Sequence, residues 1–207
     1  MSATPPTGDP LVGRFVRLDV MQPGDAEGLH AVYTDPSVYN QGFIMRPAPD
    51  DLAATRTDTA RNIAARGAGR TAYTVRLTGE GGLGEAGTVV GTSSLGDVDL
   101  ENERIHLGWT MYGSRWWGTQ VNPECKLLLL GHAFDCGFGR VKIQTDAVNL
   151  RSQAAIAKLG ATREGVLRRH TKRADGSFRD SVVFSVLAHE WPSVRAGLEQ
   201  RLGMPAG

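Results

Sequence analysis

The stretch MYGSRWWGTQVNPECK, residues 111–126, joins a predicted strand to a predicted helix. It is the part of the sequence that is most informative about the fold. Asn122 suits the N-cap, Pro123 suits the first helical position, and Glu124 places an acid in the first turn. We therefore predict a helix from this point to about Cys136. The order of strand, loop and capped helix indicates an α/β unit.

The loop inside this stretch has the features of an anion-binding site. A helix N-terminus presents unpaired backbone N–H groups and the positive end of its dipole, so it can hold a phosphate or a pyrophosphate. Gly118 allows the backbone to approach a ligand closely, and Arg115 can add a charge-assisted bond. The alternative is an ordinary turn between strand and helix, with Trp116 and Trp117 as packing residues. The spacing alone leaves both open.

Strand and helix signals alternate on both sides of the join. A glycine cluster at 79–87 is typical of the loop of a hairpin, and Asp175-Gly176 indicates a second hairpin near the C-terminus. The order of these signals predicts one mixed α/β domain. The expected strands are 13–20, 71–77, 88–95, 104–111, 140–145, 166–172 and 181–187, and the expected helices are 25–33, 51–65, 122–136, 150–159 and one from 192.

Composition narrows the class of protein further. The chain has 207 residues, with 23 basic and 22 acidic side chains and a formal net charge of +1. This balance argues against nucleic acid as the main partner and gives no general attraction to anionic membranes. No apolar run approaches the roughly 18 residues of a membrane span. Residues 1–10 are predicted to be a flexible leader, and residues 11–207 to be the domain.

The two cysteines, Cys125 and Cys136, do not form a disulfide framework. On one helix they would lie roughly 16 Å apart, whereas a disulfide needs Cα atoms within about 7 Å. Reduced cysteines are typical of a cytoplasmic protein, which is our expectation for this chain. His30, His132 and His189 show no metal-ligand spacing, so no metal is expected.

Several motifs in sequence order resemble the GNAT N-acetyltransferase superfamily. Arg115-x-x-Gly118-x-Gln120 is similar to its Gln/Arg-x-x-Gly-x-Gly/Ala loop, and it departs from that pattern only at Gln120. Later segments resemble the RimJ/RimL-like branch, and the resemblance spans about residues 10–200. These segments are NLRS at 149–152, AIAKLGA at 155–161, EGVLR at 164–168, DGSFRDS at 175–181 and Glu190-Trp191.

The resemblance implies a single GNAT-type domain whose mostly antiparallel sheet is splayed between its fourth and fifth strands, here 104–111 and 140–145, with helices on its flanks. It implies acetyl-CoA as acyl donor, with pantetheine between these strands and pyrophosphate on the loop. A homodimer is also expected from the resemblance. The residues that we expect to bind the cofactor are Met111, Arg115, Trp117, Gly118, Thr119, Gln120, Val121, Asn122, Lys126 and Asn149.

Acyl transfer needs a base for the amine, because only a neutral amine attacks a thioester. His106 is the first candidate, since imidazole titrates near pH 6.5 and lies in the fourth strand, where relatives often carry glutamate. We expect it on one face with Arg104, Gly108 and Thr110. The alternative is a polar strand residue that only forms hydrogen bonds. Three acids are rivals for the role of base, Asp97, Glu101 and Glu103.

Ser152 is the candidate acid for the leaving thiolate. It falls in the first turn of its predicted helix, where the dipole favours a developing negative charge, and in the resembling branch this serine lies near the CoA sulfur. The alternative is a hydroxyl at a helix start with no catalytic part. Asn149 is either the N-cap of the same helix, or an amide that contacts CoA, or both.

The acceptor is less defined than the donor. Residues 35–50 are predicted to form an acceptor loop, and aromatic residues such as Trp109 and Phe43 can line the acceptor site or belong to the core. The basic stretch 168–173 around His170 can contact an acidic substrate or the CoA 3′-phosphate, or simply face solvent. We expect transfer of acetyl to a primary amine, of a protein N-terminus or of a small molecule. The alternatives are a non-catalytic acyl-CoA-binding protein and a succinyl or longer acyl donor.

Overall fold

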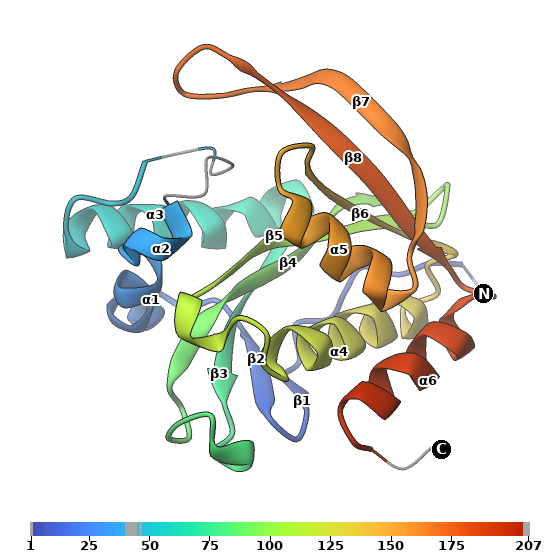
Figure 1. The fold of residues 1–207 in the computed structure, drawn as a ribbon, viewed down its shortest axis with the longest axis horizontal. Helices are drawn as coiled ribbons and strands as arrows, with labels where there is room; N and C mark the ends of the chain where they lie inside the picture. The colour runs from blue at the N-terminus through green and yellow to red at the C-terminus, as the bar shows by residue number, and fades with distance from the viewer. Residues whose placement is uncertain (1, 40–44, 46, 205–207) are drawn as a thin grey trace.

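The computed structural model describes residues 2–39, 45 and 47–204, and in these residues an eight-stranded sheet has the order β1-β2-β3-β4-β5-β6-β8-β7 (Figure 1). Neighbouring strands are antiparallel except β5 and β6, which are parallel. The strands are β1 Leu11–Val12, β2 Val16–Val20, β3 Thr71–Leu77, β4 Val89–Asp99, β5 Arg104–Tyr112, β6 Arg140–Asp146, β7 Thr162–Lys172 and β8 Phe178–Leu187.

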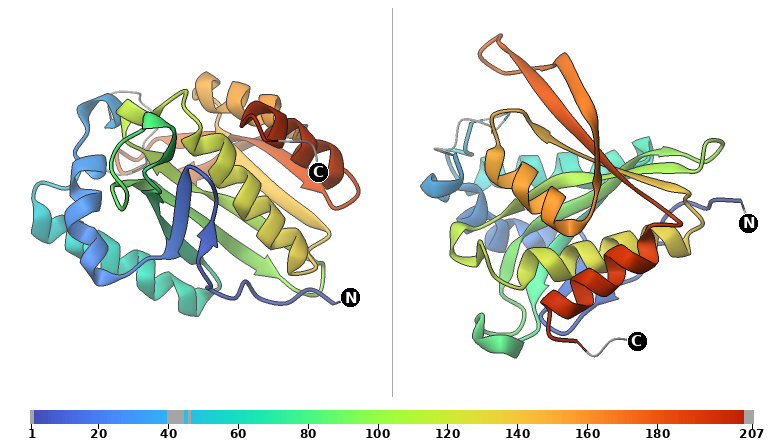
Figure 2. Two further views of the ribbon diagram at one scale, coloured as in Figure 1. Left: turned by 90° about the horizontal axis from the view of Figure 1, so that it is seen from below. Right: turned by 45° about the vertical axis from the view of Figure 1, so that its right-hand side comes forward.

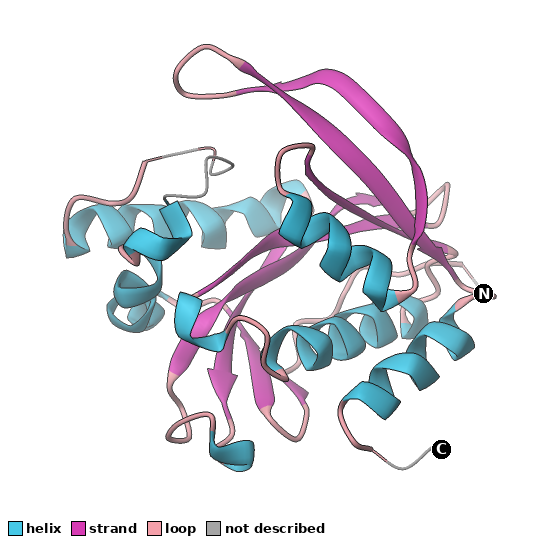
Figure 3. Cartoon of the chain, in the orientation of Figure 1, coloured by secondary structure: helices cyan, strands magenta, loops and turns pink. Residues whose placement is uncertain are grey.

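Helices cover both faces of the sheet (Figures 2 and 3). On one face, α1 and α3 pack together against β3 and β4, around buried Leu29 and Val32. On the other face, α4, α5 and α6 share the main core with the sheet. The helices are α1 Ala26–Tyr33, α2 Pro36–Tyr39, α3 Leu52–Ala64, α4 Val121–Asp135, α5 Leu150–Leu159 and α6 Trp191–Arg201.

The sheet opens between β5 and β6. The two strands pair at Arg104 with Arg140, Ile105 with Val141 and His106 with Lys142, and in the described residues no pair follows His106. Both strands nevertheless continue, β5 to Tyr112 and β6 to Asp146, so they diverge toward their C-terminal ends. The predicted splay is confirmed; the predicted fourth and fifth strands are β5 and β6 because the two-residue β1 precedes them.

A bulge interrupts β5 within the diverging part. Ser94 pairs with Gly108 and Thr92 with Met111, so Trp109 and Thr110 both lie opposite Ser93, and Trp109 has φ +50°. The extra residue reverses which face the next side chains take. The expectation that Thr110 shares a face with His106 is therefore wrong. Thr110 faces α4 instead, where it receives a hydrogen bond from the Lys126 ammonium at 2.9 Å.

Three predicted boundaries are also wrong. Helix α4 begins at Val121 with Gln120 at the N-cap, so Asn122 is not the cap, and Pro123 lies inside the first turn, where no N–H is needed. Strand β4 runs to Asp99 and β7 begins at Thr162, beyond the predicted limits, because pairing with β5 and β8 extends them. Tertiary pairing outweighs local propensity in both strands.

The predicted leader lies against the domain in the part that the structure describes. Ala3 is buried, and the Thr4 backbone N–H donates to the carbonyl of Cys136 at 2.9 Å. The Arg66 guanidinium donates to the carbonyl of Thr7 at 3.0 Å. These contacts hold the segment beside the ends of α3 and α4.

Cys125 lies within α4 and Cys136 lies at its C-terminal cap, and both are free thiols. Among the residues that the structure describes, no helix is both long enough and apolar enough to cross a membrane.

Glu124 links the start of α4 to the opposite edge of the sheet. Its buried carboxylate accepts the backbone N–H groups of Arg14 at 2.8 Å, Phe15 at 2.6 Å and Val16 at 2.7 Å. A Cβ on Gly13 would lie 2.5 Å from this carboxyl carbon, so the turn needs glycine there. The acid at the helix start therefore also fixes the turn between β1 and β2.

We expect Glu124→Ala to lower the free energy of unfolding by about 3 kcal/mol, because it leaves buried N–H groups without acceptors. Urea unfolding followed by circular dichroism measures the change. Glu27→Ala is the matched control, since Glu27 in α1 forms only an exposed ion pair with Arg56, and such pairs contribute little. Equal losses in the two variants would show that the Glu124 carboxylate does not hold this turn.

Candidate active site

His106 occupies the point where β5 and β6 begin to diverge. The residue is 4 % exposed, and Nδ1 lies 3.1 Å from Oδ2 of Asp97 in β4. Lys142 of β6 donates to the same Oδ2 at 3.0 Å. A base, an acid and a cation from three neighbouring strands thus form one network, of which Asp97 is the centre.

The network decides the state of the imidazole. The hydrogen bond from His106, with that from Lys142, holds the pKa of Asp97 well below its ordinary value, so the carboxylate can only accept. Nδ1 must therefore carry the proton. Burial lowers the pKa of His106 below 6.5, although Asp97 opposes this effect. At neutral pH the ring is uncharged, and the lone pair of Nε2 is the basic site.

Nε2 of His106 is buried and has no hydrogen-bond partner among the described residues. The Trp109 ring lies over the imidazole with a centroid separation of 4.7 Å, and the Arg70 guanidinium lies 5.0 Å from the Trp109 ring centroid. A Cβ on Gly108 would lie 2.6 Å from Nε2 of His106, so glycine at this position leaves space for the imidazole. The unpartnered nitrogen is what a base awaiting a proton requires.

The loop after β5 is held from several sides. Trp117 Nε1 donates to the Tyr112 carbonyl at 2.9 Å, and Thr119 Oγ1 donates to the Trp116 carbonyl at 2.7 Å. Asp35, which follows α1, accepts the backbone N–H of Ser114 at 2.7 Å. The last bond was not foreseen, because Asp35 and Ser114 are far apart in the sequence.

This loop and the start of α4 present free backbone donors. Gly118 has φ +76°, and a Cβ there would meet no atom within 4 Å, so its outer side is open. Within the described residues, the N–H groups of Gly118, Gln120 and Asn122 donate to no protein acceptor. Arg115 is exposed beside them, with its guanidinium 5.9 Å from the Trp116 ring centroid. Such a cluster suits a phosphate or pyrophosphate.

The start of α5 lies beside the same loop. The Arg151 guanidinium is 3.5 Å from the centroid of the Trp117 ring, which joins α5 to the loop. Asn149 is the N-cap of α5, as predicted, and its side chain accepts the backbone N–H of Ser152 at 2.9 Å. Ser152 is half-buried in the first helical turn. The diverging ends of β5 and β6 are thus bordered by two helix N-termini.

Lys126 is 8 % exposed and its ammonium points into the protein toward β5, where it donates to Thr110 Oγ1. Thr110 Oγ1 also lies 2.7 Å from Ser93 Oγ, so the three side chains form a small polar cluster under the bulge. Within the described residues, the ammonium forms no ion pair with a carboxylate. Burial lowers the pKa of Lys126 to about 8, from an ordinary value of 10.5.

This burial predicts an unusual stability effect. Below pH 8 both folded and unfolded chains hold the proton, and burying the charge costs about 3 kcal/mol. Between pH 8 and 10.5 only the unfolded chain binds it, so stability rises with pH and the cost disappears. Lys126→Met removes the cost of burying the charge and also one hydrogen bond. We therefore expect this variant to be more stable than the wild type by about 2 kcal/mol at pH 7.

Thermal and urea unfolding at pH 7 and above pH 10 measure this effect, with exposed Lys158→Met in α5 as control. The stabilisation should fade at the higher pH, and Lys158→Met should change little at either. A Lys126→Met variant that is less stable than the wild type at pH 7 would contradict the burial cost.

The structure distributes the predicted residues along β5, the loop that follows it and the starts of α4 and α5. His106 lies at the base of the opening, Lys126 lies beneath its bulged strand, and Met111 lies further along β5, on the face of α1. The loop residues Arg115, Trp117, Gly118, Thr119, Gln120, Val121 and Asn122 lie at the far end of β5, with Asn149 and Ser152 across from them.

Two rival acids lie away from the opening, because Glu101 and Glu103 belong to the turn between β4 and β5. Phe43 and most of the segment 40–46 lie outside the described residues. No cluster of three or more histidine, cysteine, aspartate or glutamate side chains suited to a metal occurs in the described part of the chain.

A family model described as an acetyltransferase (GNAT) domain matches residues 16–162 of the chain. No curated protein matches the chain significantly. Among solved structures, one described as a candidate acetyltransferase is 38% identical, covers 100% of this chain and 99% of its own, and has a TM-score of 0.81.

A candidate acetyltransferase from T. thermophilus is 37% identical over 98% of this chain and 100% of its own, with a TM-score of 0.81. RimJ of Mycobacterium smegmatis, solved in complex with CoA-disulfide, is 20% identical over 96% of this chain and 97% of its own, with a TM-score of 0.78. At that identity the RimJ match supports the fold.

Proposed function

Because this chain belongs to the GNAT acetyltransferase family, we propose that it transfers an acyl group, in first place acetyl, from acyl-CoA to a primary amine. We place it in the RimJ/RimL-like branch on the motifs at 149–152 and 164–168. The acceptor is the N-terminus of a protein or a small-molecule amine. A cytoplasmic homodimer is part of the same proposal, and light scattering measures its assembly.

The observation that carries the proposal is the buried His106 Nε2 with no partner among the described residues, at the base of the opening between β5 and β6. The free N–H groups of the loop lie at the other end of the same strand and can hold the pyrophosphate of CoA. A base and an anion site at opposite ends of one unpaired strand edge suit an extended acyl-CoA. Both features can form in a chain whose formal net charge is only +1.

In this mechanism the amine nitrogen attacks the thioester carbonyl carbon, a C–N bond forms, and the C–S bond breaks. His106 Nε2 accepts the proton that the amine must lose, while Asp97 holds the ring in the right tautomer. Backbone N–H groups on the unpaired edge of β5 can stabilise the oxyanion. Ser152 donates a proton to the leaving thiolate at the dipole-positive start of α5, and the proton that His106 took from the amine is returned to the serine through solvent.

The other predicted residues bind the donor in this account. Gly118, Thr119, Gln120, Val121 and Asn122 contact pyrophosphate mainly through the backbone, with Arg115 as the exposed cation. Met111 contributes the strand edge, Trp117 the wall of the loop, and Asn149 the start of α5. Lys126 supports the donor-binding strand from beneath, where its ammonium bonds Thr110 at a cost in stability, a trade of stability for function.

A second function, a non-catalytic acyl-CoA-binding protein, is favoured by one observation: the base nitrogen is covered by Trp109. Calorimetric titration with acetyl-CoA and succinyl-CoA, followed by thiol release with a panel of amines, distinguishes the two. The transferase requires binding and amine-dependent thiol release. Binding of acetyl-CoA without thiol release for any amine would support the non-catalytic binding protein. Tighter binding of succinyl-CoA than of acetyl-CoA would identify succinyl as the transferred group.

A further inference from the structure

Three buried polar atoms without partners among the described residues share one face of three adjacent strands. They are His106 Nε2 in β5, Gln144 Oε1 in β6 and Arg179 Nε in β8. The face follows from register, because His106 pairs with Lys142, Gln144 with Val183, and Asp146 with Ser181, two residues after Arg179. Their neighbours Ile143 and Phe184 point to the opposite face, into the main core.

Buried polar groups are nearly always hydrogen-bonded, and a partnerless one calls for an explanation. Here one partnerless atom is the proposed base, and the other two lie along the same surface toward the open ends of β6 and β8. A substrate that reaches His106 from this face passes over them. The pattern therefore indicates polar contacts that the acceptor itself supplies.

The far end of this face carries an excess of positive charge. Arg173 forms an ion pair with the buried Asp146, and Arg179 Nε lies 4.0 Å from the same carboxylate, too far for a hydrogen bond. Within the described residues no other carboxylate lies within 4 Å of either guanidinium. Two cations share one anion, which leaves a half-buried positive charge uncompensated.

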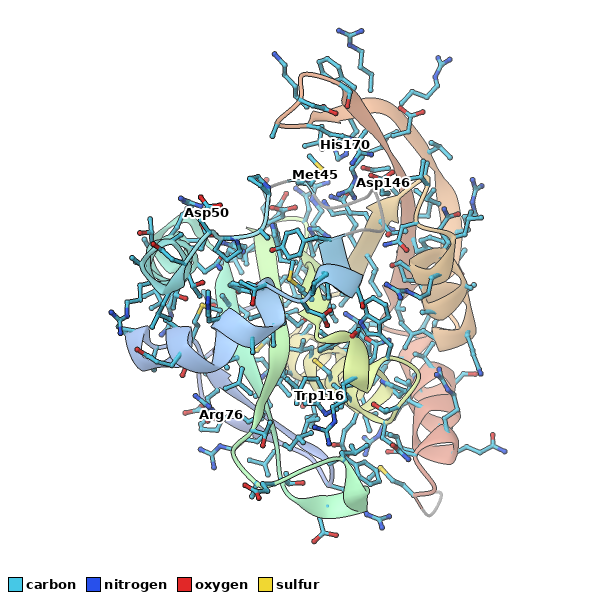
Figure 4. All side chains as sticks on the ribbon, turned by 60° about the vertical axis from the view of Figure 1, so that its left-hand side comes forward. Met45, Asp50, Arg76, Trp116, Asp146 and His170 are labelled. Carbon is cyan, nitrogen blue, oxygen red and sulfur yellow. The ribbon has the colours of Figure 1, made fainter. Side chains whose placement is uncertain are left out.

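This end of the face is also where other segments meet. His170 Nδ1 lies 3.0 Å from Ser181 Oγ, and the Arg173 guanidinium lies 4.0 Å from Met45 Sδ. In Figure 4, Met45, Asp146 and His170 gather at one end of the molecule, beside the hairpin of β7 and β8. The cations thus come from the hairpin and face the strands of the proposed active site.

We propose that the acceptor amine carries an anionic group, a carboxylate or a phosphate, which Arg179 and Arg173 bind while the amine reaches His106. Asp146 lies four residues beyond Lys142 on β6, which is roughly 13 Å along the strand. The anion is therefore about four extended residues from the reacting amine, and Gln144 lies midway. The proposal rests on the proposed function and specifies its acceptor.

The test uses tetrapeptide amides with free N-termini, Ala-Ala-Ala-X, where X is aspartate, phosphoserine, asparagine or lysine. The ratio of kcat/KM values is measured with acetyl-CoA. One charge-assisted contact predicts a preference of at least roughly tenfold for aspartate or phosphoserine over asparagine, and lysine should be poorest. The aspartate and phosphoserine peptides separate the two sources of anion. An asparagine peptide as good as both would overturn the proposal.

Arg179→Gln should reduce this preference to within about twofold. The control is Lys172→Gln, which removes an equal charge from the same hairpin on the opposite face, because Lys172 pairs with Phe178 next to the pair of Thr171 and Arg179. Lys172→Gln should keep the preference. If Arg179→Gln slows acidic and neutral peptides equally, the arginine only supports the hairpin.

A second readout does not depend on turnover. The Arg179 Nε–H resonance, assigned by its loss in Arg179→Gln, should shift saturably when inorganic phosphate or glutarate is added, and it should stay fixed if the site binds no anion. Calorimetry with acetyl-CoA separates the outcomes further. Failure of acetyl-CoA to bind counts against the proposed function alone. Arg179→Gln could also weaken the binding of acetyl-CoA while leaving the binding of dephospho-CoA, which lacks the 3′-phosphate, unchanged. That result would assign the cations to the CoA 3′-phosphate and overturn the proposal.

Discussion

His106→Ala should lower kcat/KM for acyl transfer by roughly a thousandfold, which corresponds to about 4 kcal/mol of transition-state stabilisation. The imidazole is neutral because burial lowers its pKa, its Nδ1 proton is committed to Asp97, and its Nε2 has no other partner among the described residues. Alanine removes the base and leaves the donor loop untouched. Acetyl-CoA affinity, measured by calorimetry, should therefore remain close to that of the wild type.

The role of His106 as base also predicts how kcat/KM depends on pH. A protonated His106 cannot accept a proton, so kcat/KM should fall as pH drops through its pKa, and this acid limb should lie below pH 6.5. The limb should vanish in His106→Ala. His132→Ala is a matched control, because His132 in α4 also has a buried Nε2 without a described partner, away from the opening. Full activity in His106→Ala would exclude the imidazole as the base.

Gly118→Trp should weaken acetyl-CoA binding by at least roughly a thousandfold, about 4 kcal/mol. The open side of Gly118 is the space in which we place the pyrophosphate, and an indole ring there displaces it. The protein itself tolerates the new side chain except for a left-handed backbone, which costs about 1 kcal/mol. Calorimetric titration with acetyl-CoA measures the effect.

Gly87→Trp provides the control for this variant. Gly87 also has a left-handed backbone, with φ +84°, and open space around its Cβ, but it lies in the loop between β3 and β4. It should bind acetyl-CoA as the wild type does. Unaltered affinity in Gly118→Trp would remove the loop from the donor site.

The parts of this molecule that could be predicted from sequence are those with local signals. The N-cap at Asn149 and the turn at Asp175-Gly176 follow from backbone chemistry within a few residues, and the structure has both. The divergence of β5 and β6 followed from resemblance to a family rather than from local pattern. The other strands and helices and their order followed in the same two ways, except the two-residue strand β1 and the four-residue helix α2, which were not predicted.

What could not be predicted depends on contacts between distant residues. The bulge at Trp109 has no sequence signal, since neither glycine nor asparagine stands there, and it moved Thr110 to the face of α4. The ion pair of Asp146 with Arg173 and the three bonds of Glu124 join segments far apart in the chain. Asp97 was foreseen only as a rival base, because strand pairing is what places it against His106.

The function that we propose for the opening between β5 and β6 is acyl transfer from acyl-CoA to an amine. The most direct measurement is mass spectrometry of an amine library incubated with acetyl-CoA and the wild-type protein. At least one primary amine should gain one acetyl group, in step with thiol release, and His106→Ala should lose most of this product. Acetyl-CoA binding with no acylated amine anywhere in the library would contradict it.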